Sequence, residues 1–179
     1  MSKNNTVKRL VLLAILTTIL FVQEQALTFI PNVQLTFLLL ILYATSLTFI
    51  ENILIIVIHV LLDNLVMGSF NFVYIPFMLI GYLIIPLLMH TVFKKVRSPI
   101  SLAFLGILFS LIYSWAFIIP QVFILQVPFL TYIVADIPFE IILATSSFLT
   151  ILWLYKPLKE VLDDYVVADD NKEAEKEEE

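Results

Sequence analysis

The chain lacks cysteine and contains three glycines in its 179 residues. Without cysteine there is no disulfide framework and no thiolate metal site. No Gly-Lys-Ser or Gly-Lys-Thr sequence occurs, so the chain has no P-loop with which to use ATP. His59 and His90 do not form an H-E-x-x-H pair, and Ser146-Ser147 lack a Gly-x-Ser-x-Gly elbow. We therefore expect no enzyme activity, no metal and no cofactor bound by this chain.

Lysine and arginine are absent from Leu10–Phe93 and from Ser98–Tyr155. Hydrophobic residues make up 61% of the sequence, against about 45–50% in soluble domains. Such an excess, arranged in long runs, predicts an integral membrane protein. The net charge of −5 comes largely from Asp169–Glu179, and the rest is close to neutral. We expect this acidic tail to be disordered, and nothing in the charge pattern indicates nucleic-acid binding.

The apolar runs predict an all-α integral membrane protein with six transmembrane helices. The expected domains are an N-terminus over 1–9, a six-helix membrane domain over 10–162 and an acidic cytoplasmic tail over 163–179. The alternative for the N-terminal run is a signal peptide, but no A-x-A cleavage site follows it. The runs are Leu10–Val22, Val33–Ile50, Ile53–Met67, Phe70–Phe93, Ile100–Leu125 and Phe129–Tyr155.

The basic residues predict the orientation of these helices. They gather in Lys3–Arg9, Lys94–Arg97 and Lys156–Lys159, apart from two lysines in the tail. The positive-inside rule places such clusters in the cytoplasm. Six helices put all three clusters on one side, which gives an N-in, C-in topology. The outward connections are then 23–32, 68–71 and 120–128.

Polar residues gather in the outer halves of the predicted helices. His59 and Asp63 are four residues apart and share a helix face, as do Asp136 and Glu140, with Pro138 between the last two. Ionisable residues inside membrane helices usually face a cavity and mark a site. We therefore predict a substrate site formed by Gln23, Glu24, Asn32, Gln34, His59, Asp63, Asn64, Asn71, Tyr74, Trp115, Tyr132, Asp136 and Glu140. A structural polar network, or an acid pair that carries protons, is the alternative.

Three stretches resemble a known family of membrane proteins. They read "QEQALTFIPNVQLTFLLLILYA", "IHVLLDNLVMGSFNFVYIPFMLIGYLIIPLL" and "YIVADIPFEIILATSSFLTILWLYKPL". Together with the short six-helix chain, they resemble the substrate-binding S components of energy-coupling factor (ECF) vitamin transporters. The resemblance covers roughly Val7 to Leu162.

The resemblance implies a function in the plasma membrane of a bacterium. An S component binds a vitamin at the outer side, under its outer loops. It associates with a shared transmembrane coupling protein and two ATPases, and tips over in the membrane to release its cargo inside. Family members often carry Ala-x-x-x-Ala on the first helix for this association. Here Ala14 and Thr18 are the nearest match, so they are the expected docking residues.

The side chains of the predicted site favour one class of cargo. The outer halves of the later helices contain no lysine or arginine to bind a carboxylate. Acids, amides, one histidine and aromatic rings suit a neutral or cationic heteroaromatic ring, such as hydroxymethylpyrimidine, a thiamine precursor, or a B6 vitamer. The stretch 23–32 is expected to form a gate over it. The alternatives are a scaffold of cell-wall synthesis of the MreD type and a stand-alone ion-coupled carrier.

Overall fold

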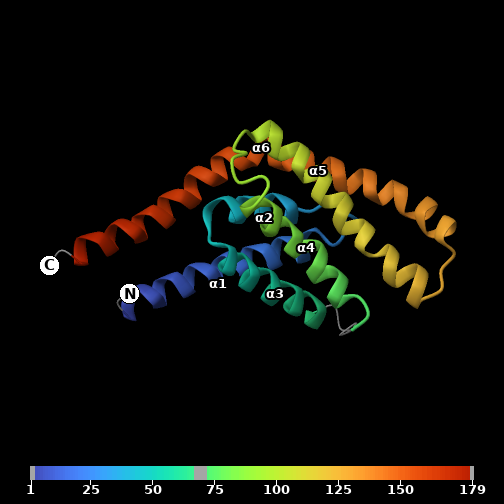
Figure 1. The fold of residues 1–179 in the computed structure, drawn as a ribbon, viewed down its shortest axis with the longest axis horizontal. Helices are drawn as coiled ribbons and strands as arrows, with labels where there is room; N and C mark the ends of the chain where they lie inside the picture. The colour runs from blue at the N-terminus through green and yellow to red at the C-terminus, as the bar shows by residue number, and fades with distance from the viewer. Residues whose placement is uncertain (1–2, 67–71, 178–179) are drawn as a thin grey trace.

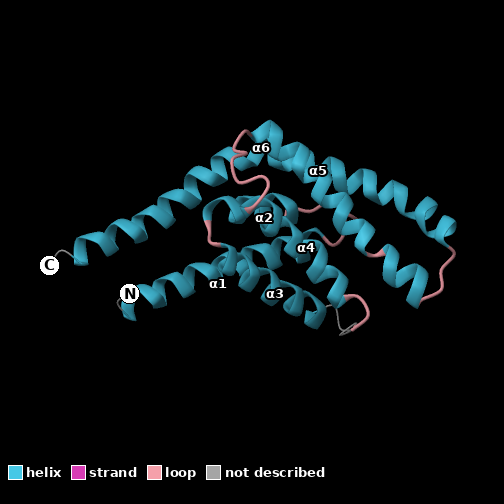
Figure 2. Cartoon of the chain, viewed as in Figure 1, coloured by secondary structure: helices cyan, strands magenta, loops and turns pink. Residues whose placement is uncertain are grey.

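The structure is a computed structural model that describes residues 3–66 and 72–177, with the side chains of 6–66 and 72–166. The described part is all-helical and contains no strand (Figure 2). The helices are α1 Lys3–Leu27, α2 Thr36–Ser46, α3 Phe49–Val66, α4 Ile75–His90, α5 Pro99–Ala116, the π-helix η1 Pro120–Ile124, and α6 Phe129–Glu177.

Successive α-helices run in alternate directions along the molecule (Figure 1). The connections 28–35 and 117–128 lie toward the right of the view, the connection 47–48 lies left of the middle, and the connection 91–98 lies near the middle. Both labelled chain ends lie at the left. The basic N-terminal segment and the basic connection 91–98 therefore lie to the left of the connections predicted to face outward.

The short helix α2 forms the centre of the bundle. It packs against α1, α3, α4, α5 and α6, and residues 36–44 are all buried. A helix that is apolar on every side is stable only when it is covered on every side. Eleven residues rise only about 16 Å, which is less than the thickness of a bilayer core.

The predicted run Val33–Ile50 is divided because α3 begins earlier than the sequence indicated. Thr48 and Glu51 form a capping box: the Thr48 amide donates to Glu51 Oε2 at 2.8 Å, and the Glu51 amide donates to Thr48 Oγ1 at 3.4 Å. Arg9 of α1 also donates to Glu51 Oε2, at 2.9 Å. This contact joins α1 to the start of α3.

Among the described residues, four helical segments are long and apolar enough to cross a membrane: Thr6–Leu27, Phe49–Val66, Pro99–Ile124 and Phe129–Val166. The apolar helices α2 and α4 are shorter. Large apolar side chains cover the outside of the long helices, and Trp153 is 67% exposed. Soluble proteins rarely expose so much continuous apolar surface. The fold is therefore compatible with a membrane location.

The last helix, α6, is longer than the sequence suggested. It is continuous from Phe129 to Glu177, with Pro138 and Pro157 inside it. The distal segment is rich in Ala, Glu and Lys, which are good helix formers. Lys159 and Asp163 also form an ion pair one turn apart, which supports the helix where it leaves the bundle.

Candidate functional site

Three consecutive polar residues, Gln23, Glu24 and Gln25, lie in the last turns of α1. The sequence placed them in an outer loop, but the helix continues to Leu27 and the connection begins at Thr28. Consecutive side chains on a helix point about 100° apart. The three residues therefore reach different neighbours, with α2 on one side and α3 on the other.

Gln23 binds the beginning of α2. Its Oε1 accepts a hydrogen bond from the Leu35 amide at 2.8 Å, and its Nε2 donates to Thr36 Oγ1 at 2.9 Å. The first amides of a helix have no partners within that helix. Gln23 thus supplies the cap that the apolar sequence of α2 lacks. Its role in this structure is to position α2.

Glu24 and Gln25 reach two ionisable residues on α3. Glu24 Oε2 lies 3.0 Å from Nε2 of His59, without the geometry of a directed hydrogen bond. Gln25 Nε2 donates to Asp63 Oδ1 at 2.7 Å. His59 and Asp63 are buried, with His59 fully inaccessible. The predicted pair on α3 is thus joined to α1, and two carboxylates flank the imidazole.

Aromatic rings from α4 and α5 close the other side of this cluster. The Tyr82 and Tyr113 rings are stacked, with centroids 4.3 Å apart, and Tyr82 also lies 5.9 Å from the His59 ring. Gly81 allows the stack, because a Cβ there would lie 2.7 Å from Tyr113 Cδ2. We call Glu24, Gln25, His59, Asp63 and Tyr82 the α1–α3 cluster.

The α1–α3 cluster has hydrogen-bonding capacity that the protein does not use. Both ring nitrogens of His59 are buried, and neither makes a hydrogen bond of good geometry with the residues that the structure describes. The Tyr82 hydroxyl is also buried, with the Tyr113 hydroxyl as its nearest partner. Leaving a buried donor or acceptor unpaired costs about 1–3 kcal/mol. Such groups are suited to a ligand that brings its own donors and acceptors.

A small hollow lies beside the cluster under the α1–α2 connection. Its volume is about 140 Å³, and Glu24, Thr28, Asn32 and Gln34 supply its polar lining. Asn32 has φ +58°, a left-handed conformation that turns the chain sharply after Pro31. Three predicted site residues thus share one hollow, with Glu24 common to it and to the buried cluster.

Other predicted residues form a second polar group between α5 and α6. Ser114 Oγ donates to Asp136 Oδ2 at 2.9 Å, and the Gln121 side chain donates to the Tyr74 hydroxyl at 3.0 Å. Tyr132 lies near Asp136 on α6, and Glu140 is half-buried one turn further along.

The predicted site residues thus form two sets of hydrogen bonds on different helices, and Gln34 of the α1–α2 connection also bonds to Ser146 of α6. α3 packs against α1 and α4, whereas α6 packs mainly against α5 and α2. Asn64 is buried beside Asp63, but its amide donates to the Val60 carbonyl oxygen at 2.8 Å. Trp115 is 53% exposed on α5. Asn71 and the predicted connection 68–71 lie outside the described residues.

Three residues of the site were not in the predicted set. Gln25 follows two predicted residues, and its bond to Asp63 results from its position in the last turns of α1. Thr36 accepts a hydrogen bond from Gln23 and donates one to Gln34. It lies near the start of an apolar run, so its sequence context did not indicate a polar role. Tyr82 could have been predicted from its neighbour. Gly81 precedes it within a long apolar run, and a glycine there indicates that two helices approach closely.

Comparisons with protein-family models, with curated proteins and with solved structures found no match to this chain. The described residues themselves show a helical protein with four helices long and apolar enough to cross a membrane, and a buried polar cluster between them. Among the described side chains, no three His, Cys, Asp or Glu residues form a group that could hold a metal ion.

The bond between Gln25 and Asp63 gives a stability prediction. Gln25→Leu leaves the buried Asp63 carboxyl without this partner and should lower the free energy of unfolding by about 1–3 kcal/mol. In an Asp63→Leu background, the same change should cost much less, since no carboxyl is left unpaired. Unfolding in detergent, followed by circular dichroism, measures all four proteins of the cycle.

The matched control combines Gln25→Leu with Glu140→Leu, which removes a carboxyl on α6 instead. The losses in unfolding free energy caused by these two changes should be additive, because Glu140 takes no part in the bond between Gln25 and Asp63. An equal cost of Gln25→Leu in the native and Asp63→Leu backgrounds would show that the hydrogen bond contributes nothing to stability.

Proposed function

We propose that this chain is the substrate-binding S component of an ECF-type importer, in the plasma membrane of a bacterium. It captures a small vitamin or vitamin precursor outside the cell for uptake driven by partner ATPases. The observation that carries the proposal is the buried α1–α3 cluster, in which His59 lies beside a carboxylate and has unused hydrogen-bonding capacity. Costly polar groups in an apolar bundle are typical of a binding site.

The proposed topology has six helices with both termini in the cytoplasm. The alternating helices support it, since the basic N-terminal segment and the basic connection 91–98 lie to the left of the α1–α2 connection (Figure 1). The shortness of α2 is compatible with this topology, because α2 is surrounded by protein and need not match the lipid thickness. The hollow under the α1–α2 connection would then open to the outside.

The chemistry of the cluster supports a cationic or donor-rich substrate. Glu24 and Asp63 are acceptors when ionised, and His59 can donate or accept. The paired rings of Tyr82 and Tyr113 offer an aromatic surface beside them. A small heteroaromatic ring fits this combination, and we name hydroxymethylpyrimidine and B6 vitamers as the leading candidates.

The α1–α2 connection acts in this proposal as a gate. Ligand pockets usually have volumes of about 300–1,000 Å³, whereas this hollow has about 140 Å³. A substrate therefore enters only if the connection moves. The part that would move is 28–33, because Ser146 of α6 holds Gln34 and Gln23 holds Leu35 at the α2 end of the connection.

A ligand-binding measurement tests the proposal. The native protein in detergent, titrated by calorimetry with a vitamin panel that includes hydroxymethylpyrimidine and pyridoxine, should bind at least one member. Glu24→Gln and His59→Gln should each weaken that binding roughly 5- to 150-fold, since each removes a group that would pair with the substrate in a buried site.

His90→Gln is the matched control, because His90 lies at the opposite end of α4 and packs on Phe49. It should leave binding unchanged. A well-folded native protein that binds no vitamin and carries none from rich medium would favour the scaffold function instead.

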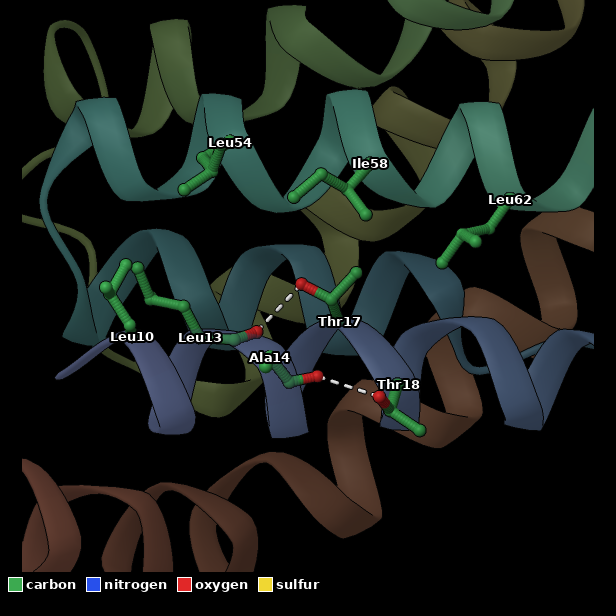
Figure 3. A pocket seen from close by; sticks show the side chains of 8 residues that line it. All are labelled: Leu10, Leu13, Ala14, Thr17, Thr18, Leu54, Ile58 and Leu62. Atoms are coloured by element: carbon green, nitrogen blue, oxygen red, sulfur yellow. Dashed lines mark hydrogen bonds between the residues drawn. The ribbon is translucent and has the colours of Figure 1, made fainter. Parts of the chain in front are cut away.

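A groove between α1 and α3 supports the proposed association with the coupling protein (Figure 3). Ala14 and Thr18 of α1 line one side, and Leu54, Ile58 and Leu62 of α3 line the other. The Thr18 hydroxyl donates to the Ala14 carbonyl oxygen at 2.8 Å, so its hydrogen is already bonded within α1. Small residues flanked by larger ridges allow a second helix to approach closely.

Filling this groove should prevent assembly. Ala14→Leu combined with Thr18→Leu should abolish co-purification of the coupling protein and ATPases while leaving vitamin binding intact. Val11→Leu with Val22→Leu enlarges two exposed α1 residues outside the groove and should have no effect. Retention of the complex by the groove-filled variant would place the docking surface elsewhere.

A further inference from the structure

A basic hollow lies at the end of the bundle opposite the α1–α3 cluster. Arg97, Lys156 and Lys159 line it with Glu160, and its volume is about 370 Å³. Three cations thus face one carboxylate. Lys159 is paired with Asp163, and one Arg97 nitrogen donates to the neighbouring Val96 carbonyl oxygen at 2.9 Å. Arg97 also has further donors for an anion.

The α4–α5 connection and α6 supply these cations. Arg97 lies two residues before the start of α5, and Lys156 and Lys159 lie on one face of α6. α5 and α6 are extensively packed against each other. Tyr155 forms part of the wall, and its hydroxyl donates to Thr45 Oγ1 of α2 at 3.2 Å. The hollow is therefore built on packed helices rather than on loose surface lysines.

The surrounding surface places this hollow at the edge of the apolar belt. Ile100 and Phe104 of α5 are exposed apolar side chains, and Trp153 of α6 is exposed three residues before Lys156. Tryptophan is enriched where a bilayer meets water. In the proposed topology these cations would lie on the cytoplasmic side of the apolar surface, near the level of lipid head groups.

We propose that the hollow binds the phosphate group of an anionic phospholipid. Its volume falls in the range of ligand pockets, and basic pockets between membrane helices are suited to anionic head groups. Arg97 offers a planar fork for phosphate oxygens, and Lys156 adds a mobile point charge. This site is independent of the proposed vitamin site, which lies at the other end of the bundle.

Fluorescence quenching by brominated lipids tests the proposal. The chain has two tryptophans, so Trp115→Phe leaves Trp153 as the only reporter beside the hollow. In nanodiscs, brominated phosphatidylglycerol should quench Trp153 at lower mole fraction than brominated phosphatidylcholine. Arg97→Gln with Lys156→Gln should weaken this preference about 20- to 30-fold, for two cations removed.

Lys94→Gln with Lys95→Gln is the matched control, since it removes the same charge from exposed residues that do not line the hollow. It should change the preference far less. Equal quenching by the two lipids, or an equal loss in both double variants, would overturn the proposal. So would stabilisation by inorganic phosphate in detergent, lost in Arg97→Gln/Lys156→Gln, without a lipid preference, because the site would then serve a soluble anion.

Discussion

The structure depends on the polar contacts that the end of α1 makes with α2 and α3. In an apolar bundle, a buried polar group finds a partner inside the protein or carries a penalty. Gln23 caps α2, Glu24 lies against His59, and Gln25 bonds to Asp63. Because consecutive helical residues diverge by about 100°, one short stretch fixes two neighbours at once. These contacts hold the buried α2 in register and define the candidate site.

This arrangement relates the proposed site to the proposed docking surface through one helix. Glu24 follows Thr18 by six residues, which is about 9 Å along α1. The same helix contacts α3 at Arg9 and Glu51, beyond the groove. A substrate that shifts the last turns of α1 would therefore act on a helix that also lines the docking groove. Within the proposed function, this coupling through α1 would let the docking groove respond to a bound substrate.

The sequence predicted an all-helical protein and many of its buried polar residues, but not which of these residues contact one another across helices. Apolar runs and basic clusters indicated the helices, since hydropathy and charge act locally. The pairing of Gln25 with Asp63, and the separation of Asp136 from His59, depend on which helices pack together. The buried α2 was also unpredictable, because an apolar run looks the same whether lipid or protein surrounds it. The capping box at Thr48 was visible in the sequence and would have corrected the start of α3.

The central claim is that the hollow beside Glu24 opens on the side of the membrane opposite the basic segments. The chain has no cysteine, so single cysteines report without background. Thr28 lines the hollow, and Ser98 lies in the basic connection before α5. A membrane-impermeant maleimide should label Thr28→Cys in intact cells and Ser98→Cys only after permeabilisation. Labelling in the reverse order would contradict the account, because the site would then face the cytoplasm.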